Sequence, residues 1–268
     1  DAVETMTYFL DAVMEEYIKK TKGVRFMETA HNFAKHWRAL GIGQLGWHSL
    51  LHSKMTPFES FEALELGEEI SQFIDERSLA ASEEMAEIYG TPEGLNGYNC
   101  RNLTRCAIAP TTSSSFILGQ VSPSIEPLAS NYFVKDLAKG VFTYRNPWLV
   151  EVLDSHDKND DETWESILIH KGSVQHLDFL TENEKNVFKT FSEISPLNVV
   201  QQAAARQAYI DQSQSLNLMI PHDAPVKDIN ALIIEGWRLG VKTFYYQRSS
   251  NPAQELVRDI MTCVSCEA

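Results

Sequence analysis

The first 90 residues carry apolar side chains at the three-to-four-residue spacing of a helix face. Two such stripes come first, made of Phe9, Leu10, Val13, Met14 and Tyr17, then of Phe26, Ala30, Phe33 and Trp37. A third apolar pattern, set among many glutamates, runs from about Phe58 to Tyr89, and Gly90 follows as a C-cap. We therefore expect a helical N-terminal segment whose last helix has one solvated acidic face.

Strand-like and helical patterns alternate in the rest of the chain. Residues 103–109, 215–220 and 241–246 are predicted as short strands, the last of them buried, because they are rich in apolar, β-branched or aromatic residues. Helices are expected over about 196–211 and 227–239, with Gly240 ending the second. Residues 131–190 are less regular, and 154–162 resemble an acidic surface loop. This alternation predicts an α/β architecture.

Length and charge narrow the class of protein. The chain has 268 residues, of which 43% are hydrophobic and 22% charged, as in a globular protein. Its 37 acidic and 23 basic residues give a net charge of −14, which argues against binding to nucleic acid or an anionic membrane. A small anionic ligand held by local backbone dipoles remains compatible with this charge.

Targeting signals and cysteine usage suggest a compartment. No apolar run approaches the roughly 18 residues of a membrane-spanning helix, and the N-terminus resembles no secretory signal. The first residue is Asp1, so we expect a chain that is processed, split or cut from a longer one. Four cysteines are too few for a disulfide scaffold, which favours a reducing, cytoplasmic setting.

Pro110, Thr111, Thr112, Ser113 and Ser114 follow directly after a predicted strand. Where a strand turns into the start of a helix, unpaired backbone N–H groups and hydroxyls converge on one point, which suits a phosphate group. The same residues are also typical of an ordinary N-cap and polar turn. The motif alone leaves both interpretations open.

Tyr245 and Tyr246 close the run 241–246. Adjacent strand residues point to opposite faces, so such a pair ordinarily packs against two separate surfaces. A redox role requires the two phenols to stack instead, in departure from this alternation.

Cys263 and Cys266 form a Cys-x-x-Cys pair near the end of the sequence. Two thiols at this spacing can close a disulfide and exchange with other dithiols. The alternative is half of a zinc site completed by Cys100 and Cys106, whose wider spacing fits such sites poorly. We favour redox chemistry, because ordering a mobile terminal segment costs conformational entropy.

The glycines at positions 41, 43 and 46 superficially fit a dinucleotide-binding fingerprint. They follow a helical stripe rather than a strand, so the context of that fingerprint is absent. We expect a tight turn in which backbone meets backbone.

Taken together, these features resemble the C-terminal half of the large, catalytic subunit of class I ribonucleotide reductases. The segments that carry the resemblance are 38–43, 101–104, 109–115, 124–127, 209–215, 239–247 and the terminal cysteine pair. Their order and spacing agree over almost the whole chain. The resemblance implies the second half of a ten-stranded α/β barrel over residues 1–248, with a helical N-terminal segment, and a mobile redox-active tail over 249–268.

The resemblance also implies roles for the three motifs. Residues 110–114 would hold the substrate diphosphate, with Thr112 standing where many relatives have a glutamate. Tyr245 and Tyr246 would relay an electron and a proton between a small radical-generating subunit and the active site. Cys263 and Cys266 would re-reduce the active-site disulfide and be reset by thioredoxin or glutaredoxin. The chain itself would bind no metal or other cofactor, since the radical-generating metal belongs to the small subunit.

The family's thiyl cysteine lies in an Asn-x-Cys-x-Glu setting that this sequence lacks. Asn99-Cys100-Arg101-Asn102 has no glutamate, and we expect Cys100 and Cys106 to be structural. Half a barrel leaves strand edges and apolar faces uncovered, so we expect an enzyme completed by a separate N-terminal portion of the large subunit. The expected substrate is a ribonucleoside diphosphate.

Two other hypotheses stay open. One is a cobalamin-dependent class II relative, against which the tyrosine pair argues because that class needs no relay. The other is an inert nucleotide-binding or assembly fragment, which has no chemical need for paired thiols and phenols.

Overall fold

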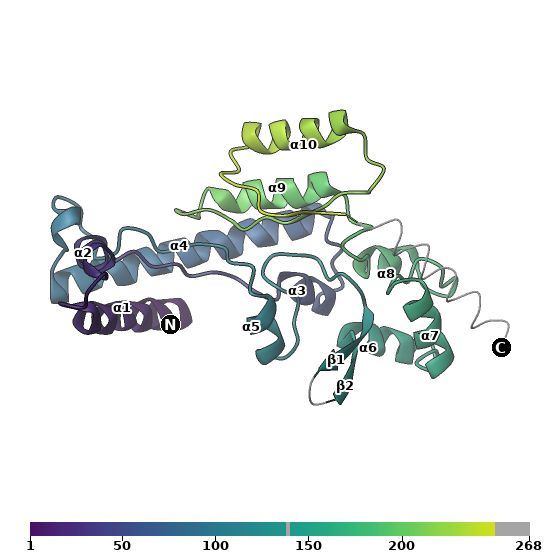
Figure 1. Ribbon diagram of the computed structural model, residues 1–268. Helices are drawn as coiled ribbons and strands as arrows, with labels where there is room; N and C mark the ends of the chain where they lie inside the picture. The colour runs from purple at the N-terminus through teal and green to yellow at the C-terminus, as the bar shows by residue number, and fades with distance from the viewer. Residues whose placement is uncertain (138–139, 250–268) are drawn as a thin grey trace.

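The computed structural model describes residues 1–137 and 140–249 (Figure 1). The N-terminal segment is helical, as predicted, with α1 (Ala2–Thr21), α2 (Glu28–Trp37), α3 (Trp47–Ser53) and α4 (Phe61–Tyr89). Helix α4 has 29 residues and contacts both α1 and α9 (Pro196–Gln207). Gly90 ends it with a φ of +85°, a conformation that only glycine adopts without strain.

The remaining elements follow in chain order and are short. They are η1 (Glu93–Leu95), α5 (Thr112–Ile117), β1 (Tyr132–Leu137), β2 (Gly140–Arg145), α6 (Pro147–Ser155), α7 (Asp161–Ile169), α8 (Glu182–Val187), α9, β3 (Leu218–Met219), α10 (Val226–Arg238) and β4 (Gln247–Arg248). The predicted helices over 196–211 and 227–239 are confirmed as α9 and α10, and Gly240 follows α10 with a φ of +83°. The predicted acidic loop is shorter than expected, because α6 extends to Ser155 and α7 begins at Asp161.

Four extended segments lie side by side and run parallel. Residues 40–43 pair with 104–108, which pair with 213–220, and these pair in turn with 245–248. Representative backbone bonds are Ile42 N–H to the Arg105 oxygen at 2.7 Å, Ile108 N–H to Ser213 at 3.2 Å and Leu218 N–H to Tyr246 at 2.9 Å. Parallel neighbours need long crossovers, and helices α3 and α4, then α9, then α10 lie in those crossovers. The α/β prediction is confirmed.

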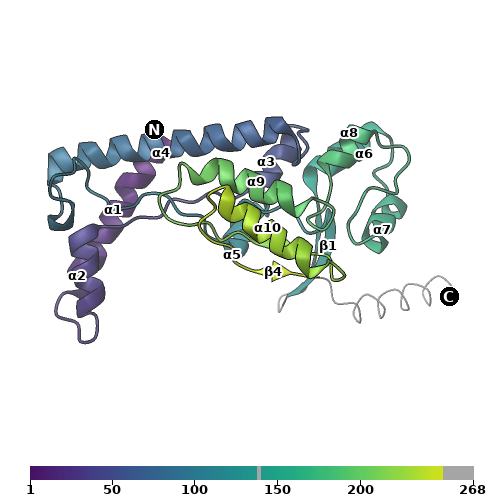
Figure 2. The same cartoon turned by 90° about the horizontal axis from the view of Figure 1, so that it is seen from above.

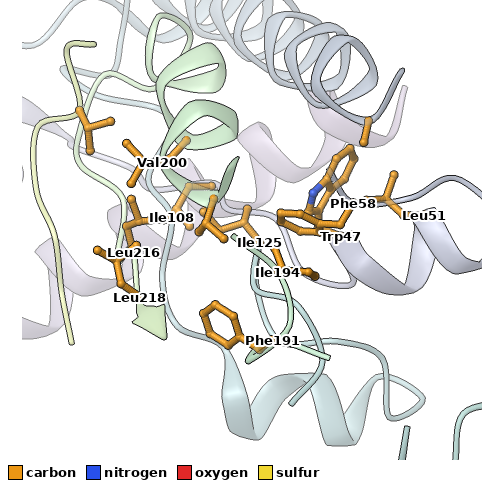
Figure 3. Close-up of a cluster of buried hydrophobic side chains, with 14 of the residues drawn as sticks. Trp47, Leu51, Phe58, Ile108, Ile125, Phe191, Ile194, Val200, Leu216 and Leu218 are labelled. Carbon is orange, nitrogen blue, oxygen red and sulfur yellow. The ribbon is translucent and has the colours of Figure 1, made fainter. Parts of the chain in front are cut away.

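The main hydrophobic core lies between these segments and helices α3, α4 and α9 (Figure 3). Ile108, Leu216 and Leu218 come from the extended segments, and Val200 of α9 packs in the same cluster. Trp47 of α3 is buried there as well, and its indole N–H donates to Gln202 of α9 at 2.8 Å. This bond joins two elements that are 155 residues apart in sequence.

The glycines of residues 41–46 allow two of the extended segments to approach closely. A Cβ atom on Gly43 would lie 2.7 Å from the backbone oxygen of Ala107, well inside normal contact distance. Gly46 has a φ of +80° just before α3. The predicted close approach of backbone to backbone is therefore confirmed, whereas the predicted tight turn is wrong, because residues 40–43 form an extended segment paired with 104–108.

A second, smaller core is formed by the region that the sequence pattern left as less regular. Helices α6, α7 and α8 stand at one end of the molecule (Figure 2), and the antiparallel hairpin β1–β2 contacts α7 through β1. Its fully buried side chains include Leu149, Leu153, Trp164, Ile167 and Phe188.

A pair of buried histidines in α3 lies where the two cores meet. The rings of His48 and His52 have centroids 4.0 Å apart. His48 Nδ1 accepts from the Leu128 N–H at 2.9 Å, and His52 Nδ1 lies 3.2 Å from Asn146 Nδ2. The His52 ring also packs against Phe188 of the smaller core. Burial lowers the pKa of His52 to about 3 and that of His48 well below its usual range, so both rings are neutral.

Several apolar side chains of the N-terminal helices face solvent. Phe9 and Val13 of α1 and Phe33 of α2 are exposed, although they belong to the apolar stripes seen in the sequence. Within the described residues, no helix is both long and apolar enough to cross a membrane.

Candidate functional site

The two tyrosines predicted as a redox pair are in direct contact. Their ring centroids are 4.1 Å apart with the planes tilted by 49°, and the Tyr245 hydroxyl donates to the Tyr246 hydroxyl at 3.4 Å. This hydrogen bond raises the pKa of Tyr245. The side chains are 49% and 56% exposed, so the prediction of a buried strand over 241–246 is wrong at these positions.

The contact is explained by an irregularity in the backbone pairing. In a regular parallel pair, one residue both donates to and accepts from the residues flanking its partner. Here the Tyr245 N–H donates to the Leu216 oxygen, whereas the Leu218 N–H donates to the Tyr246 oxygen, both at 2.9 Å. Two consecutive tyrosines therefore stand opposite one residue, Asn217, which is the definition of a β-bulge. A bulge interrupts the alternation of side chains and allows neighbours to meet.

The extra N–H group of this bulge is satisfied by a side chain. Asn217 is fully buried, and its Oδ1 accepts from the Tyr246 N–H at 3.0 Å. Asn217 Nδ2 donates in turn to Glu126, which is 6% exposed. Burial raises the pKa of the Glu126 carboxyl, and the Asn217 bond and the charge of Arg248 partly oppose this.

Residues 110–114 form a strained turn that leads into α5. Thr111 has a φ of +49°, which is unusual for a β-branched residue and costs about 1–2 kcal/mol. Its hydroxyl accepts from the Ser124 N–H at 2.8 Å, which ties the turn to the segment that carries Glu126. Thr112, Ser113 and Ser114 are exposed and occupy the first turn of α5, where backbone N–H groups have no intrahelical partner.

The cysteines divide into two groups. Cys106 is buried on the second extended segment, and burial raises the pKa of its thiol to about 11. Burial also raises the pKa of the half-buried Cys100. Both are free thiols of low reactivity, in keeping with the predicted structural role. Cys263 and Cys266 lie outside the described residues.

In the described part of the chain, no three His, Cys, Asp or Glu side chains gather as a metal site.

Comparison with known proteins places the chain in a family. A family model described as "Ribonucleotide reductase, barrel domain" matches residues 1–102 and 93–247. The chain belongs to the ribonucleotide reductase barrel-domain family.

Similar proteins cover nearly all of the chain. The large subunit of ribonucleoside-diphosphate reductase from Invertebrate iridescent virus 6 is 37% identical over 255 residues, which is 94% of this chain and 26% of that protein. The corresponding protein of Invertebrate iridescent virus 3 is 37% identical over 90% of this chain and 38% of its own length. Among solved structures, the class Id ribonucleotide reductase alpha subunit of Actinobacillus ureae has a TM-score of 0.89 and 50% identity, over 93% of this chain and 46% of that one. The chain thus spans less than half of these relatives.

Other residues shared with the family pattern have a structural role here. Arg38 and Arg101 both pair with the buried carboxylate of Asp11, through bonds of 2.8 and 2.9 Å. Asn102 donates to the same carboxylate at 3.0 Å and to the Arg38 backbone oxygen at 3.1 Å. This cluster joins α1, the end of α2 and the chain after α4. These contacts give a structural reason for arginine and asparagine at these positions.

The sequence pattern did not single out Asn217 or Glu126 as functional residues. One signal was available, since Asn217 interrupts an apolar run between Leu216 and Leu218. A polar side chain in a buried strand needs a hydrogen-bond partner, which is a reason to look for one.

Proposed function

We propose that this chain is the C-terminal part of the large subunit of a ribonucleoside-diphosphate reductase and that it carries the radical relay, the diphosphate-binding turn and the thiol tail. The observation that supports this most strongly is the phenol–phenol contact of Tyr245 and Tyr246 in a chain of this family. Two tyrosines that merely pack a strand would lie on opposite faces.

The tyrosine pair carries out the relay. A phenol that loses one electron becomes a strong acid, so its proton must leave with the electron. When one ring is a neutral phenoxyl radical, an electron and a proton pass to it together from the other phenol across the 3.4 Å contact, so that the first ring becomes a phenol again and the second becomes the radical. Both rings are partly exposed, so a small radical-generating subunit can approach them from solvent.

The turn at residues 110–114 holds the diphosphate of the substrate. The free N–H groups of the first α5 turn and the hydroxyls of Thr112, Ser113 and Ser114 supply donors without a formal charge. Thr112 adds a hydroxyl where many relatives have a carboxylate, so no anion opposes the phosphate at this position. These local dipoles act against the net charge of −14 of the whole chain.

The reaction replaces the 2′-hydroxyl of the ribose by hydrogen, releases water, and oxidises two thiols to a disulfide. An N-terminal portion of the large subunit supplies the thiyl cysteine and the inner cysteine pair. Cys263 and Cys266 reduce that disulfide by exchange and become a disulfide themselves, which thioredoxin or glutaredoxin then reduces.

Reconstitution with the missing parts tests this function. The chain is mixed with an N-terminal half, a small subunit and a thiol reductant, and conversion of a ribonucleoside diphosphate to its deoxy form is measured. Tyr245→Phe and Tyr246→Phe should each reduce turnover to background, because phenylalanine has no O–H to oxidise. Tyr98→Phe removes an exposed hydroxyl outside the site and should leave the rate unchanged.

Two outcomes contradict the proposal. Full turnover by Tyr246→Phe would exclude the relay. Turnover that requires cobalamin and no small subunit would place the chain with the cobalamin-dependent relatives.

A further inference from the structure

The bulge at Tyr245 and Tyr246 creates a backbone requirement that a regular strand does not have. The Leu216 oxygen, which a regular ladder would offer to the Tyr246 N–H, accepts from the Tyr245 N–H instead. A buried N–H without a partner costs about 1–3 kcal/mol. The Tyr246 N–H is partly buried and needs another acceptor, which Asn217 Oδ1 supplies at 3.0 Å.

The side chain of Asn217 is itself fixed by a buried carboxylate. Its Nδ2 donates to Glu126 Oε1, so the amide cannot rotate to present nitrogen to the Tyr246 N–H. Burying Glu126 is unfavourable, since a carboxyl group out of water loses its hydration. For packing alone, two apolar residues at these positions would be as stable or more stable. The Asn217–Glu126 pair is instead explained by the acceptor that Asn217 offers to the Tyr246 N–H.

The Glu126 segment is anchored independently of the tyrosines. Ser122 and Ser49 of α3 exchange hydrogen bonds of 3.1 and 2.8 Å between hydroxyls and backbone N–H groups. The Ser124 N–H donates to Thr111 in the strained turn, and the Trp47 N–H donates to the Ser124 oxygen at 3.2 Å. Glu126 thus extends from a rigid support that also carries the proposed diphosphate-binding turn.

We propose that Asn217 and Glu126 are positioning residues that hold the bulge and thereby keep the Tyr245 and Tyr246 phenols in contact. Neither residue touches the reacting atoms. This inference deepens the proposed relay, but the contact that it explains can be measured without turnover.

The test follows the two phenols by NMR in the chain labelled with ¹³Cζ-tyrosine. Tyr245→Phe and Tyr246→Phe assign the two signals, and a pH titration gives the midpoint of Tyr245. That midpoint should fall in Tyr246→Phe, since the hydrogen bond from Tyr245 to Tyr246 is what raises its pKa. The decisive variant is the double replacement Asn217→Leu and Glu126→Leu, which removes both buried polar partners together and avoids leaving either one unpaired.

We expect the double variant to lose more than half of the shift that Tyr246→Phe abolishes. Glu126→Gln keeps an oxygen acceptor for Asn217 Nδ2 and should retain the wild-type midpoint. Asn146→Leu is the matched control, since Asn146 is also fully buried and donates to Asn131 at 2.8 Å, far from the tyrosines in the smaller core. It should lower stability and leave the Tyr245 midpoint unchanged.

The outcomes separate this inference from the proposed function. An unchanged Tyr245 midpoint in the folded double variant would overturn the positioning role, whatever the activity of the assembled enzyme. A midpoint that falls equally in Asn146→Leu would also overturn it, because the effect would then be general loosening. If the double variant does not fold, Glu126→Leu alone is measured with the same criterion, and a wild-type midpoint there overturns the role of Glu126.

Discussion

The buried histidine pair of α3 makes a quantitative prediction about stability and pH. His48 and His52 are neutral in the folded chain, because burial holds the pKa of His52 at about 3 and that of His48 well below its usual range. In the unfolded chain both titrate near 6.5. The unfolded state therefore binds more protons below pH 6.5, and the free energy of unfolding falls as the pH falls. Stability from the pair is fully present above pH 6.5.

The size of the effect follows from linkage. Between pH 7.5 and 5.5, a group with an unfolded pKa of 6.5 that stays neutral in the folded state removes about 1.4 kcal/mol. Two such groups remove about 2.7 kcal/mol, a large part of the 5–15 kcal/mol typical of a domain. The window ends at 5.5 so that most carboxylates stay ionised throughout.

Urea unfolding at several pH values measures this loss. His48→Asn with His52→Asn is the informative variant, because the asparagine oxygen can take the place of Nδ1 as an acceptor and does not titrate. The variant should lose about 2.7 kcal/mol less than the wild type over this interval. Equal losses in the wild type and the double variant would refute the assignment of two buried neutral rings.

Two further predictions concern the Asp11 cluster and the cysteines. Asp11→Asn removes the buried carboxylate that Arg38 and Arg101 share, and Arg38 keeps the partly exposed Glu15 at 2.9 Å as its acidic partner. The change should lower the free energy of unfolding by up to about 3–5 kcal/mol, measured by urea unfolding. Asp161→Asn breaks an exposed pair with Arg145 and should cost no more than about 1 kcal/mol. A cost below about 1 kcal/mol for Asp11→Asn would contradict the buried ion pair. Cys106 should resist iodoacetamide at pH 8 in the folded chain, because its pKa of about 11 leaves little thiolate, and it should react after unfolding. Peptide mapping measures the rate of alkylation. Alkylation of Cys106 in the folded chain as fast as in urea would contradict its burial.

The sequence predicted the long elements because they repeat their pattern several times. Helix α4 spans eight turns, so its acidic and apolar faces and its glycine cap are legible without a structure. Helices α6, α7 and α8 have nine, nine and six residues, too few for a period to stand out, and their core was therefore missed. Trp164 and Phe188 become core residues only through contacts made across that region.

The candidate site was predictable in its residues but not in its geometry. The tyrosine pair could be singled out from the sequence, whereas strand alternation argued that the two rings point apart. The bulge that brings them together depends on which backbone groups pair with residues 216–218, and Asn217 gains its meaning only from that pairing. Local propensity carries no information about such a register.

The row of parallel segments has two outer sides, at residues 40–43 and at β4, to which the described chain adds no further strand. A complementary half-barrel would have to join both margins to close the ring. Once one edge is paired, the other edge is held close to its own partner strand, so the second pairing becomes an intramolecular step at high effective concentration. Pairing at the two edges should therefore occur as a single concerted event. A substitution that weakens pairing at residues 40–43 or at β4 would weaken pairing at the other edge as well.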